Sequence, residues 1–251
     1  MKDLPKCYGV IPARYESSRF PGKPLVNILG KPMFWHVYNR ASQCKRIQKV
    51  VLATDDERIY AAAEKLIVPV MMTADTHRCG TERIFEAAEK LKVSANSVVI
   101  NIQGDEPALK PQMLEQLLAP FQSPLVQVST LAHLINYDEA LSPDKVKVVI
   151  DHNNNALYFS RHPIPFTRDD ADKESYYGHI GVFAFRMKTL KEFVSLARSP
   201  LEKREKLEQL RLLENGYEIH VVKTDHQCHG VDRPGDIKIA EMMLRQEGTE
   251  N

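Results

Sequence analysis

The segment CYGVIPARYESSRFPGKPL, residues 7–25, joins a short apolar run to a loop that is rich in cations. The apolar run, residues 7–13, has the length and composition of a buried strand. Behind it, Arg14, Arg19 and Lys23 lie among prolines and a glycine that restrict the backbone. Guanidinium groups and an ammonium group held in such a loop suit a polyanion such as a triphosphate. A solvated charged loop is the alternative interpretation.

Strands and helices alternate in the rest of the first half. This alternation predicts βαβ units and a mostly parallel sheet. Asp56 is available to cap the second helix, and Thr81 and Glu82 begin the third, where threonine caps and acids suit the helix dipole. The expected strands are residues 49–55, 68–73 and 97–103, and the expected helices are residues 32–44, 56–66, 80–91 and 112–121.

The order of elements changes after about residue 125, where several strands follow one another with few helices between them. They indicate a smaller antiparallel or mixed lobe within about residues 125–190 of one domain, residues 1–251. A helix over residues 199–216 follows, with Ser199 and Glu202 as a capping box and Leu207, Leu210 and Leu213 facing the core. The expected strands are residues 124–132, 144–151, 155–160, 178–186 and 217–223, and a last helix begins at about Pro234.

Composition excludes several classes of protein. The 251 residues carry a net charge of +1, whereas general nucleic-acid binders are usually basic, so we expect no nucleic-acid partner. No apolar run approaches the length of a membrane span, and the first residues do not resemble a signal peptide. Four scattered cysteines indicate reduced thiols, so we expect a cytoplasmic protein without a membrane partner.

Two carboxylates are candidates for a metal site. Asp105 follows the strand-like run in NIQGDEP, and Asp232 precedes a predicted helix in GVDRPGDI. A carboxylate at the end of a strand can hold a Mg²⁺ ion that also contacts phosphates. Each has a simpler explanation, an acidic turn for Asp105 and a helix cap for Asp232. The HQCH run at residues 226–229 lacks a second ligand cluster and is best explained as a chance grouping.

Six segments in this order resemble the 3-deoxy-manno-octulosonate cytidylyltransferase (CMP-KDO synthetase) family over nearly the whole chain. They are IPARYESSRFPGKPL, NIQGDEP, ALYFSRHPIP, HIGVFAFR, LEQLRLLENG and GVDRPGDI. The resemblance implies a nucleotidyltransferase with a doubly wound, Rossmann-like, mixed but mostly parallel sheet, and a homodimer. It also implies the reaction of CTP with KDO to give CMP-KDO and pyrophosphate, for lipopolysaccharide synthesis.

The resemblance also implies roles for individual residues. Lys23, Arg14 and Asp105 would be catalytic, and Asp105 and Asp232 would bind Mg²⁺. The CTP-binding residues would be Arg14, Arg19, Lys23, Gly80, Thr81 and Gln103. The residues that bind the acid sugar would be Arg161, His179, Glu208 and Gln209.

The sequence departs from the family pattern at a few positions. Phe183 stands where the family commonly has a tyrosine, Cys79 replaces a usual serine, and Arg233 follows Asp232. These changes leave the cations and carboxylates intact but put the accepted sugar in question. An 8-amino-KDO or a nonulosonate is the alternative substrate. A non-catalytic nucleotide-binding regulator and a glycosyltransferase are alternatives of other classes, and the adjacent acids of TDDE fit a D-x-D metal motif poorly.

Overall fold

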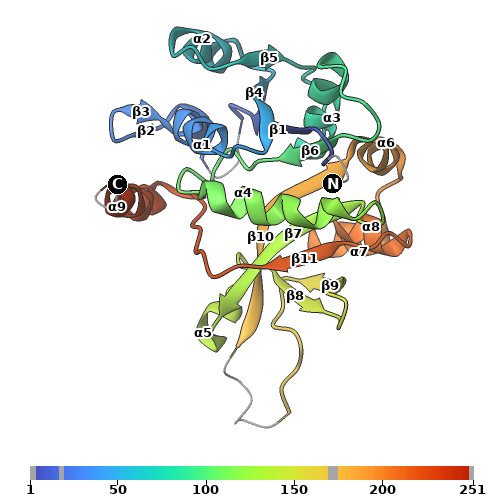
Figure 1. The fold of residues 1–251 in the computed structure, drawn as a ribbon. Helices are drawn as coiled ribbons and strands as arrows, with labels where there is room; N and C mark the ends of the chain where they lie inside the picture. Colours follow the sequence, from blue (N-terminus) through green and yellow to red (C-terminus); the bar gives the residue numbers. More distant parts are fainter. Residues whose placement is uncertain (1–3, 17–19, 169–174, 249–251) are drawn as a thin grey trace. The chain divides into compact units, whose positions relative to one another are not determined.

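The computed structural model describes residues 4–16, 20–168 and 175–248, and it divides the chain into two compact units. We call residues 5–115 and 228–251 the terminal unit, and residues 116–227, to which residues 1–4 also belong, the central unit. In Figure 1 the terminal unit is coloured blue to green, with its C-terminal helix in dark red. The central unit is coloured green through yellow to red-orange.

The terminal unit is built on four parallel strands in the order β6-β1-β4-β5. Val10 and Ile11 of β1, Leu52 of β4 and Ile100 of β6 are completely buried. Runs of apolar residues such as these are typical of parallel strands covered on both faces. The strands are β1 (Cys7–Ala13), β4 (Ile47–Thr54), β5 (Val70–Met72) and β6 (Val98–Asn101).

Helices of the terminal unit lie where the sequence predicts them, with one difference at a helix start. Asp56 caps α2, because its side chain accepts hydrogen bonds from the amides of Arg58 and Ile59. Cys79 instead of Thr81 precedes α3, and Thr81 is buried in the first turn. The elements are η1 (Lys23–Leu25), β2 (Asn27–Ile28), β3 (Lys31–Pro32), α1 (Met33–Ser42), α2 (Glu57–Lys65), α3 (Gly80–Lys90), α4 (Pro111–Leu118, which ends in the central unit), η4 (Pro234–Asp236) and α9 (Ile237–Gly248).

Antiparallel pairing dominates the central unit. Strand β10 pairs with β7 and β8, and β8 pairs with β9, all antiparallel, whereas β11 runs parallel to β7. The sequence analysis missed α6, whose start directly follows β10. The elements are η2 (Ala119–Gln122), β7 (Val128–Ile135), α5 (Tyr137–Ala140), β8 (Lys147–Ile150), β9 (Ala156–Ser160), β10 (Tyr176–Arg186), α6 (Met187–Ser195) and β11 (His220–Lys223).

The single helix expected over residues 199–216 is wrong, because the structure has two short helices, α7 (Pro200–Glu205) and α8 (Leu210–Glu214). Lys206 adopts a left-handed conformation with φ of 56°, which ends α7. The predicted capping box of Ser199 and Glu202 is present. The break also turns the second helix, so that Leu212 rather than Leu213 is buried beside Leu210.

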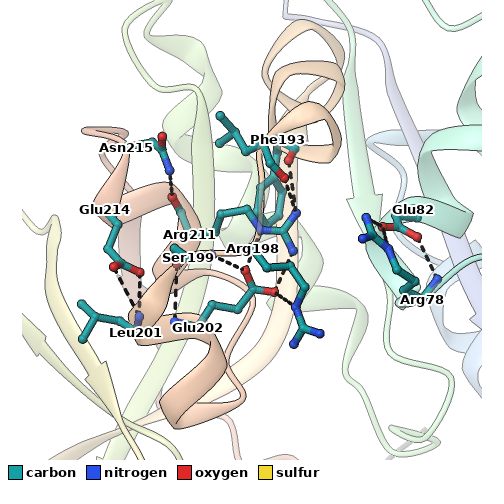
Figure 2. A network of polar contacts seen from close by, with 11 residues as sticks. Arg78, Glu82, Phe193, Arg198, Ser199, Leu201, Glu202, Arg211, Glu214 and Asn215 are labelled. Carbon is teal, nitrogen blue, oxygen red and sulfur yellow. Dashed lines mark hydrogen bonds and ion pairs between the residues drawn. The ribbon is translucent and has the colours of Figure 1, made fainter.

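A buried ion pair joins the two short helices across this break. The carboxylate of Glu202 accepts hydrogen bonds from Arg211 Nε and Nη2, both at 2.7 Å, and from Arg198 Nε at 3.1 Å (Figure 2). Glu202 is 2% exposed and Arg211 is 3% exposed. Removing either partner would leave a buried charge, so the pair fixes the connection between the helices.

The strand pairings confirm the predicted α/β class, with a mostly parallel sheet and additional antiparallel strands. The strands expected in the lobe of residues 125–190 are β7 to β10. The assignment of residues 1–251 to one domain stays a prediction. No helix within the described residues combines the length and the apolar character needed to cross a bilayer.

Candidate active site

The loop after β1 supplies two of the predicted phosphate-binding cations to one cavity of the terminal unit. Arg14 comes directly after β1, and Lys23 begins η1 behind Gly22, which has a left-handed φ of 72°. The amide of Gly22 donates to the carbonyl of Tyr15 at 2.8 Å, which closes the loop on itself. The cavity is lined by Pro12, Ala13, Arg14, Glu16, Lys23, Pro24, Gly80, Gln103, Gly104 and Asp105.

Lys23 lies between the two predicted metal carboxylates. Its Nζ is 2.6 Å from Asp105 Oδ2 and 3.5 Å from Asp232 Oδ1. The two aspartates are 127 positions apart in the chain (232 − 105), so the fold alone brings them to one cation. Three charges at one edge of the sheet form the electrostatic centre of the site.

The backbone explains how Asp232 reaches this place. The amide of Val231 donates to the carbonyl of Asp105 at 2.8 Å, which ties the two segments together. Asp236, rather than Asp232, accepts from the amides of Asp232 and Arg233, at 2.9 and 2.8 Å. The N-cap residue of η4 is Arg233, so the alternative explanation of Asp232 as the helix cap is wrong. The Asp232 carboxylate is within ion-pair range of Lys23.

Gly104 is required at the end of β6 by a close approach of two chain segments. A Cβ atom at this position would lie 2.8 Å from the carbonyl oxygen of Pro12 in β1. Any side chain there would push the two strand ends apart. The glycine thus does more than permit a bend, because it holds Asp105 close to the loop that begins at Arg14.

Arg14 is held by the loop that precedes α3. Its Nη2 group donates to the carbonyl of His77 and, at 3.4 Å, to that of Cys79. Its Nε is buried and has no hydrogen-bond partner in the described part of the chain. Buried polar groups are usually hydrogen-bonded, so this nitrogen is an exception within a side chain that lines the cavity. Arg19, the third predicted cation, lies outside the described residues.

The sequence analysis missed one polar pair that supports the two aspartates. Cys228 Sγ donates to Glu106 Oε2 at 2.5 Å, which links the residue after Asp105 to the segment that leads to Asp232. Burial, followed by the charge of Asp105, raises the pKa of Glu106 to about 7. Burial and the Glu106 carboxylate raise the pKa of Cys228. The only sequence signal was the position of Glu106 beside a predicted ligand.

The HQCH run does not form a metal site. Cys228 is committed to Glu106, and His229 faces Asp236 with a separation of 3.9 Å. Among the described residues, no group of three or more His, Cys, Asp or Glu side chains is arranged to hold a metal ion. The interpretation of this run as a chance grouping stays a prediction.

The four predicted sugar-binding residues all lie in the central unit. Arg161 follows β9, and its guanidinium donates from Nε to the carbonyl of Glu205 and from Nη1 to that of Pro143, both at 2.8 Å. The Glu205 carboxylate accepts from the amide of Arg161 at 2.9 Å. Arg161 is thus fixed in place by its neighbours, as a binding residue should be.

His179 lies on β10 between aromatic rings. Its ring centroid is 4.9 Å from that of Phe159 and 5.1 Å from that of Phe183, and its Nε2 is 2.8 Å from Thr130 Oγ1. Burial lowers the pKa of His179 to about 3, so the imidazole is neutral at physiological pH. Phe183, the departure from the family tyrosine, is largely buried and packs on this histidine.

Glu208 and Gln209 lie in the connection between α7 and α8, not on one continuous helix as expected. The carbonyl of Glu208 accepts from the amide of Arg211 at 3.0 Å, and Gln209 is the buried N-cap residue of α8. Glu208 itself is half-buried. The Glu202–Arg211 ion pair holds the helices on both sides of these two residues.

A parallel sheet whose first loop brings cations to two carboxylates is the arrangement of the nucleotidyltransferase class of α/β enzymes. The model of the cytidylyltransferase family matches residues 8–219. The chain belongs to this family.

Curated relatives match it along nearly the whole length. The chain is 58% identical to the 3-deoxy-manno-octulosonate cytidylyltransferase of Nitratidesulfovibrio vulgaris (strain DP4), over 96% of both chains. It is 52% identical to that of Lawsonia intracellularis, over 96% of this chain and 95% of the relative. It is 42% identical to the mitochondrial enzyme of Arabidopsis thaliana, over 95% of this chain and 83% of the relative.

Solved structures agree with this membership. A CMP:2-keto-3-deoxy-manno-octonic acid synthetase complexed with CTP is 42% identical and has a TM-score of 0.90, over 96% of this chain and 99% of that one. A putative glucose-1-phosphate thymidylyltransferase from Bacillus anthracis has a TM-score of 0.66 at 15% identity, over 95% of both chains. The second likeness shows the fold alone, and both agree with the predicted fold class.

Proposed function

We propose that this chain transfers CMP from CTP to the 2-hydroxyl of KDO and releases pyrophosphate. The observation that carries the proposal is the meeting of Lys23 with Asp105 and Asp232 in a cavity that Arg14 also lines. The names of relatives that are 52–58% identical over nearly the whole chain support this choice of substrates. The CTP bound in the similar synthetase structure supports it as well.

Arg14 and Lys23 would bind the phosphates of CTP. Both line the cavity, so their positive charges lie where the phosphate oxygens would bind. Gly80 and Gln103 line the same cavity and would lie against the nucleotide, while Thr81 is buried and would support the start of α3. Arg19 would add a third cation. Negative charge grows on the phosphoryl oxygens during the transfer, so fixed cations stabilise the transition state.

The residues of the site fit a magnesium ion. Asp105 and Asp232 supply hard oxygen ligands from two segments that meet at Lys23. Mg²⁺ is usually held by one or two carboxylates together with substrate phosphates and water, so two aspartates are sufficient. When bound, the ion would neutralise phosphate charge and polarise the phosphoryl group.

The central unit would bind the acid sugar. Arg161 would pair with its carboxylate, since a fixed guanidinium matches the two carboxylate oxygens. Glu208 and Gln209 would accept from or donate to sugar hydroxyls, and the neutral imidazole of His179 would contribute a hydrogen bond without charge. Both substrates are anionic, so the chain's own cations offset their mutual repulsion.

The wider setting is also part of the proposal. The product would feed the synthesis of lipopolysaccharide, and the enzyme would act in the cytoplasm as a homodimer. The four free cysteines are compatible with a reducing compartment. Molecular mass measured by light scattering would test the dimer.

Pyrophosphate release by the purified protein tests the function. We expect release with CTP, KDO and Mg²⁺, and little release when KDO is omitted or another nucleoside triphosphate replaces CTP. Parallel reactions with 8-amino-KDO and a nonulosonate compare the alternative acid sugars. Faster turnover of one of these sugars would change the assigned substrate, and no release with any acid sugar would favour a non-catalytic nucleotide-binding protein.

A further inference from the structure

Lys147 is a buried lysine that the mechanism above does not use. It lies at the start of β8 with a relative exposure of 0%. Its ammonium group donates to three backbone carbonyls, those of Ser142 at 3.0 Å, Lys145 at 2.6 Å and Arg161 at 2.5 Å. Burial, followed by the charge of Arg161, lowers its pKa. A buried cation is costly, so three strong acceptors around it are a built feature of the unit.

These bonds join Arg161 to one of the two segments that hold its side chain, the turn of residues 142–145. Lys147 binds the carbonyl of Arg161 itself and the turn of residues 142–145, whose Pro143 carbonyl accepts from Arg161 Nη1. Glu205 completes the arrangement, since its carboxylate accepts from the Arg161 amide and its carbonyl accepts from Nε. The main chain and two nitrogens of the guanidinium group are therefore fixed before any ligand arrives.

The remaining part of the guanidinium group is available to a ligand. The Nε and Nη1 groups of Arg161 donate to the carbonyls of Glu205 and Pro143. Its Nη2 group donates to no acceptor in the described part of the chain. Arg161 lines a cavity of about 700 Å³ in the central unit, together with Tyr137, Tyr176 and Phe166. Arg168 lines it as well. An organic anion with an apolar body fits such a lining, because cations bind the anion and rings contact the carbon skeleton.

We infer that Lys147 is a positioning residue that, through the Arg161 carbonyl and the Ser142–Lys145 turn, holds Arg161 ready for the carboxylate of the acid sugar. The inference rests on the proposed function, in which Arg161 binds that carboxylate. Lys147 does not touch the substrate. It acts because a guanidinium group that is already oriented loses less conformational entropy on binding.

The effect of Lys147 must be separated from a general loss of stability. Arg186 is a matched control in the same unit, because it also holds three backbone carbonyls, those of Val126, Phe121 and Ser123. These carbonyls belong to residues 121–126, a different segment from the 142–145 turn that holds Arg161. If removing a cation from a set of carbonyls merely loosens the unit, Arg186→Met should weaken sugar binding as much as Lys147→Met does.

The test is the dissociation constant of KDO, measured by isothermal titration calorimetry on the CTP-free protein, with Tm as a check of folding. We expect Lys147→Met to weaken KDO binding by about tenfold or more, as misplaced binding groups do. We expect Arg161→Gln to weaken KDO binding at least as much.

The double variant tests whether the two residues act through one contact. Lys147→Met should add little to the loss of KDO affinity in the Arg161→Gln background, because both substitutions remove the same contact with the sugar. Arg186→Met should lower Tm without changing KDO affinity.

Each outcome has one meaning. Weaker KDO binding by Arg161→Gln with normal binding by Lys147→Met would overturn the role of Lys147 and keep that of Arg161. Fully additive losses of KDO affinity in the Lys147→Met, Arg161→Gln double variant would also overturn the role of Lys147. Unchanged binding by Arg161→Gln would contradict the sugar-binding role of Arg161 and with it this inference. No binding of KDO by the wild type, either alone or with CTP in the absence of Mg²⁺, would contradict the proposed function. If Lys147→Met does not fold, Lys147→Gln keeps amide donors for the carbonyls and should weaken binding less, and unchanged binding would refute the role.

Discussion

The terminal and central units present their candidate ligand-binding groups in opposite ways. In the terminal unit, the ammonium group of Lys23 lies within ion-pair range of both Asp105 and Asp232. In the central unit, Arg161 is bound to backbone carbonyls and His179 lies among aromatic rings. One site is a cluster of one cation and two carboxylates, and in the other the side chains contact backbone carbonyls and aromatic rings.

The difference follows from the ligands that the two units are proposed to take. A triphosphate with its metal ion carries several charges, so its site needs cations and carboxylates that rearrange around them. An acid sugar carries one charge and many hydroxyls, so its site needs a single oriented cation and neutral hydrogen-bonding groups. Substitutions should therefore change turnover most in the terminal unit, and stability or sugar affinity most in the central unit.

The largest expected effect is a loss of turnover on substitution of Lys23. Lys23→Met leaves the two aspartates without their cation and removes a positive group from the phosphates. Turnover should fall by about 10²- to 10³-fold, the usual loss when one preorganised charge-stabilising donor is removed. Pyrophosphate release measures it, and Lys31→Met, an exposed lysine on β3, is the matched control. Similar losses in both variants would mean that Lys23 has no special place in the site.

The next effect is a loss of stability in the central unit. Glu202→Gln leaves the buried Arg211 without its counter-charge, and we expect the free energy of unfolding to fall by about 3 kcal/mol. The pair of Arg78 and Glu82, also drawn in Figure 2, provides the contrast, because its arginine is exposed and Glu82 is half-buried, so that Glu82→Gln should cost no more than about 1 kcal/mol. Urea denaturation measures both, and equal costs would contradict the assigned burial.

The third prediction concerns acid stability of the terminal unit. The Glu86 carboxylate accepts hydrogen bonds from Lys90, His77 and the amide of Ala74, and these outweigh burial and lower its pKa from 4.5 to about 2. Its stabilising effect is complete above pH 4.5 and is lost as the pH falls toward 2. Wild-type stability should therefore fall more steeply over this range than that of Glu86→Gln. Parallel curves in urea denaturation at each pH would refute the assignment.

The smallest effect is expected at Lys206, where the chain breaks between α7 and α8. A non-glycine residue in the left-handed region carries strain, which Lys206→Gly relieves, but glycine also gains entropy in the unfolded chain. The net change in unfolding free energy should be less than about 1 kcal/mol. Thermal denaturation measures it, and a large loss would mean that the Lys206 side chain holds the break together.

The sequence predicted elements whose signal is local and failed where distant contacts decide. The apolar runs of β1, β4 and β6 and the Asp56 cap needed only neighbouring residues. The break at Lys206 could not be read from a run of helix-favouring residues, since it is fixed by the Glu202–Arg211 pair. Likewise, Lys147 looked like an ordinary strand lysine, because its three acceptors come from other segments.

The residues of the candidate site also differ in whether local sequence signals could predict them. The cations after β1 and the acid after β6 follow from the rule that ligands bind beyond the carboxyl ends of parallel strands. That rule left Asp232 undecided between metal ligand and helix cap. In the structure the N-cap residue is Arg233, and Asp232 lies within ion-pair range of Lys23, whereas its role as a metal ligand stays a prediction.

The most direct test of the account is the Mg²⁺ dependence of pyrophosphate release from CTP and KDO in Asp105→Asn and Asp232→Asn. The control is Asp236→Asn, which keeps a capping oxygen beside the same segment. We predict near-complete loss of turnover at every Mg²⁺ concentration for Asp105→Asn, a severe loss for Asp232→Asn and near-normal turnover for Asp236→Asn. Wild-type turnover with an unchanged Mg²⁺ dependence in Asp105→Asn would contradict the account.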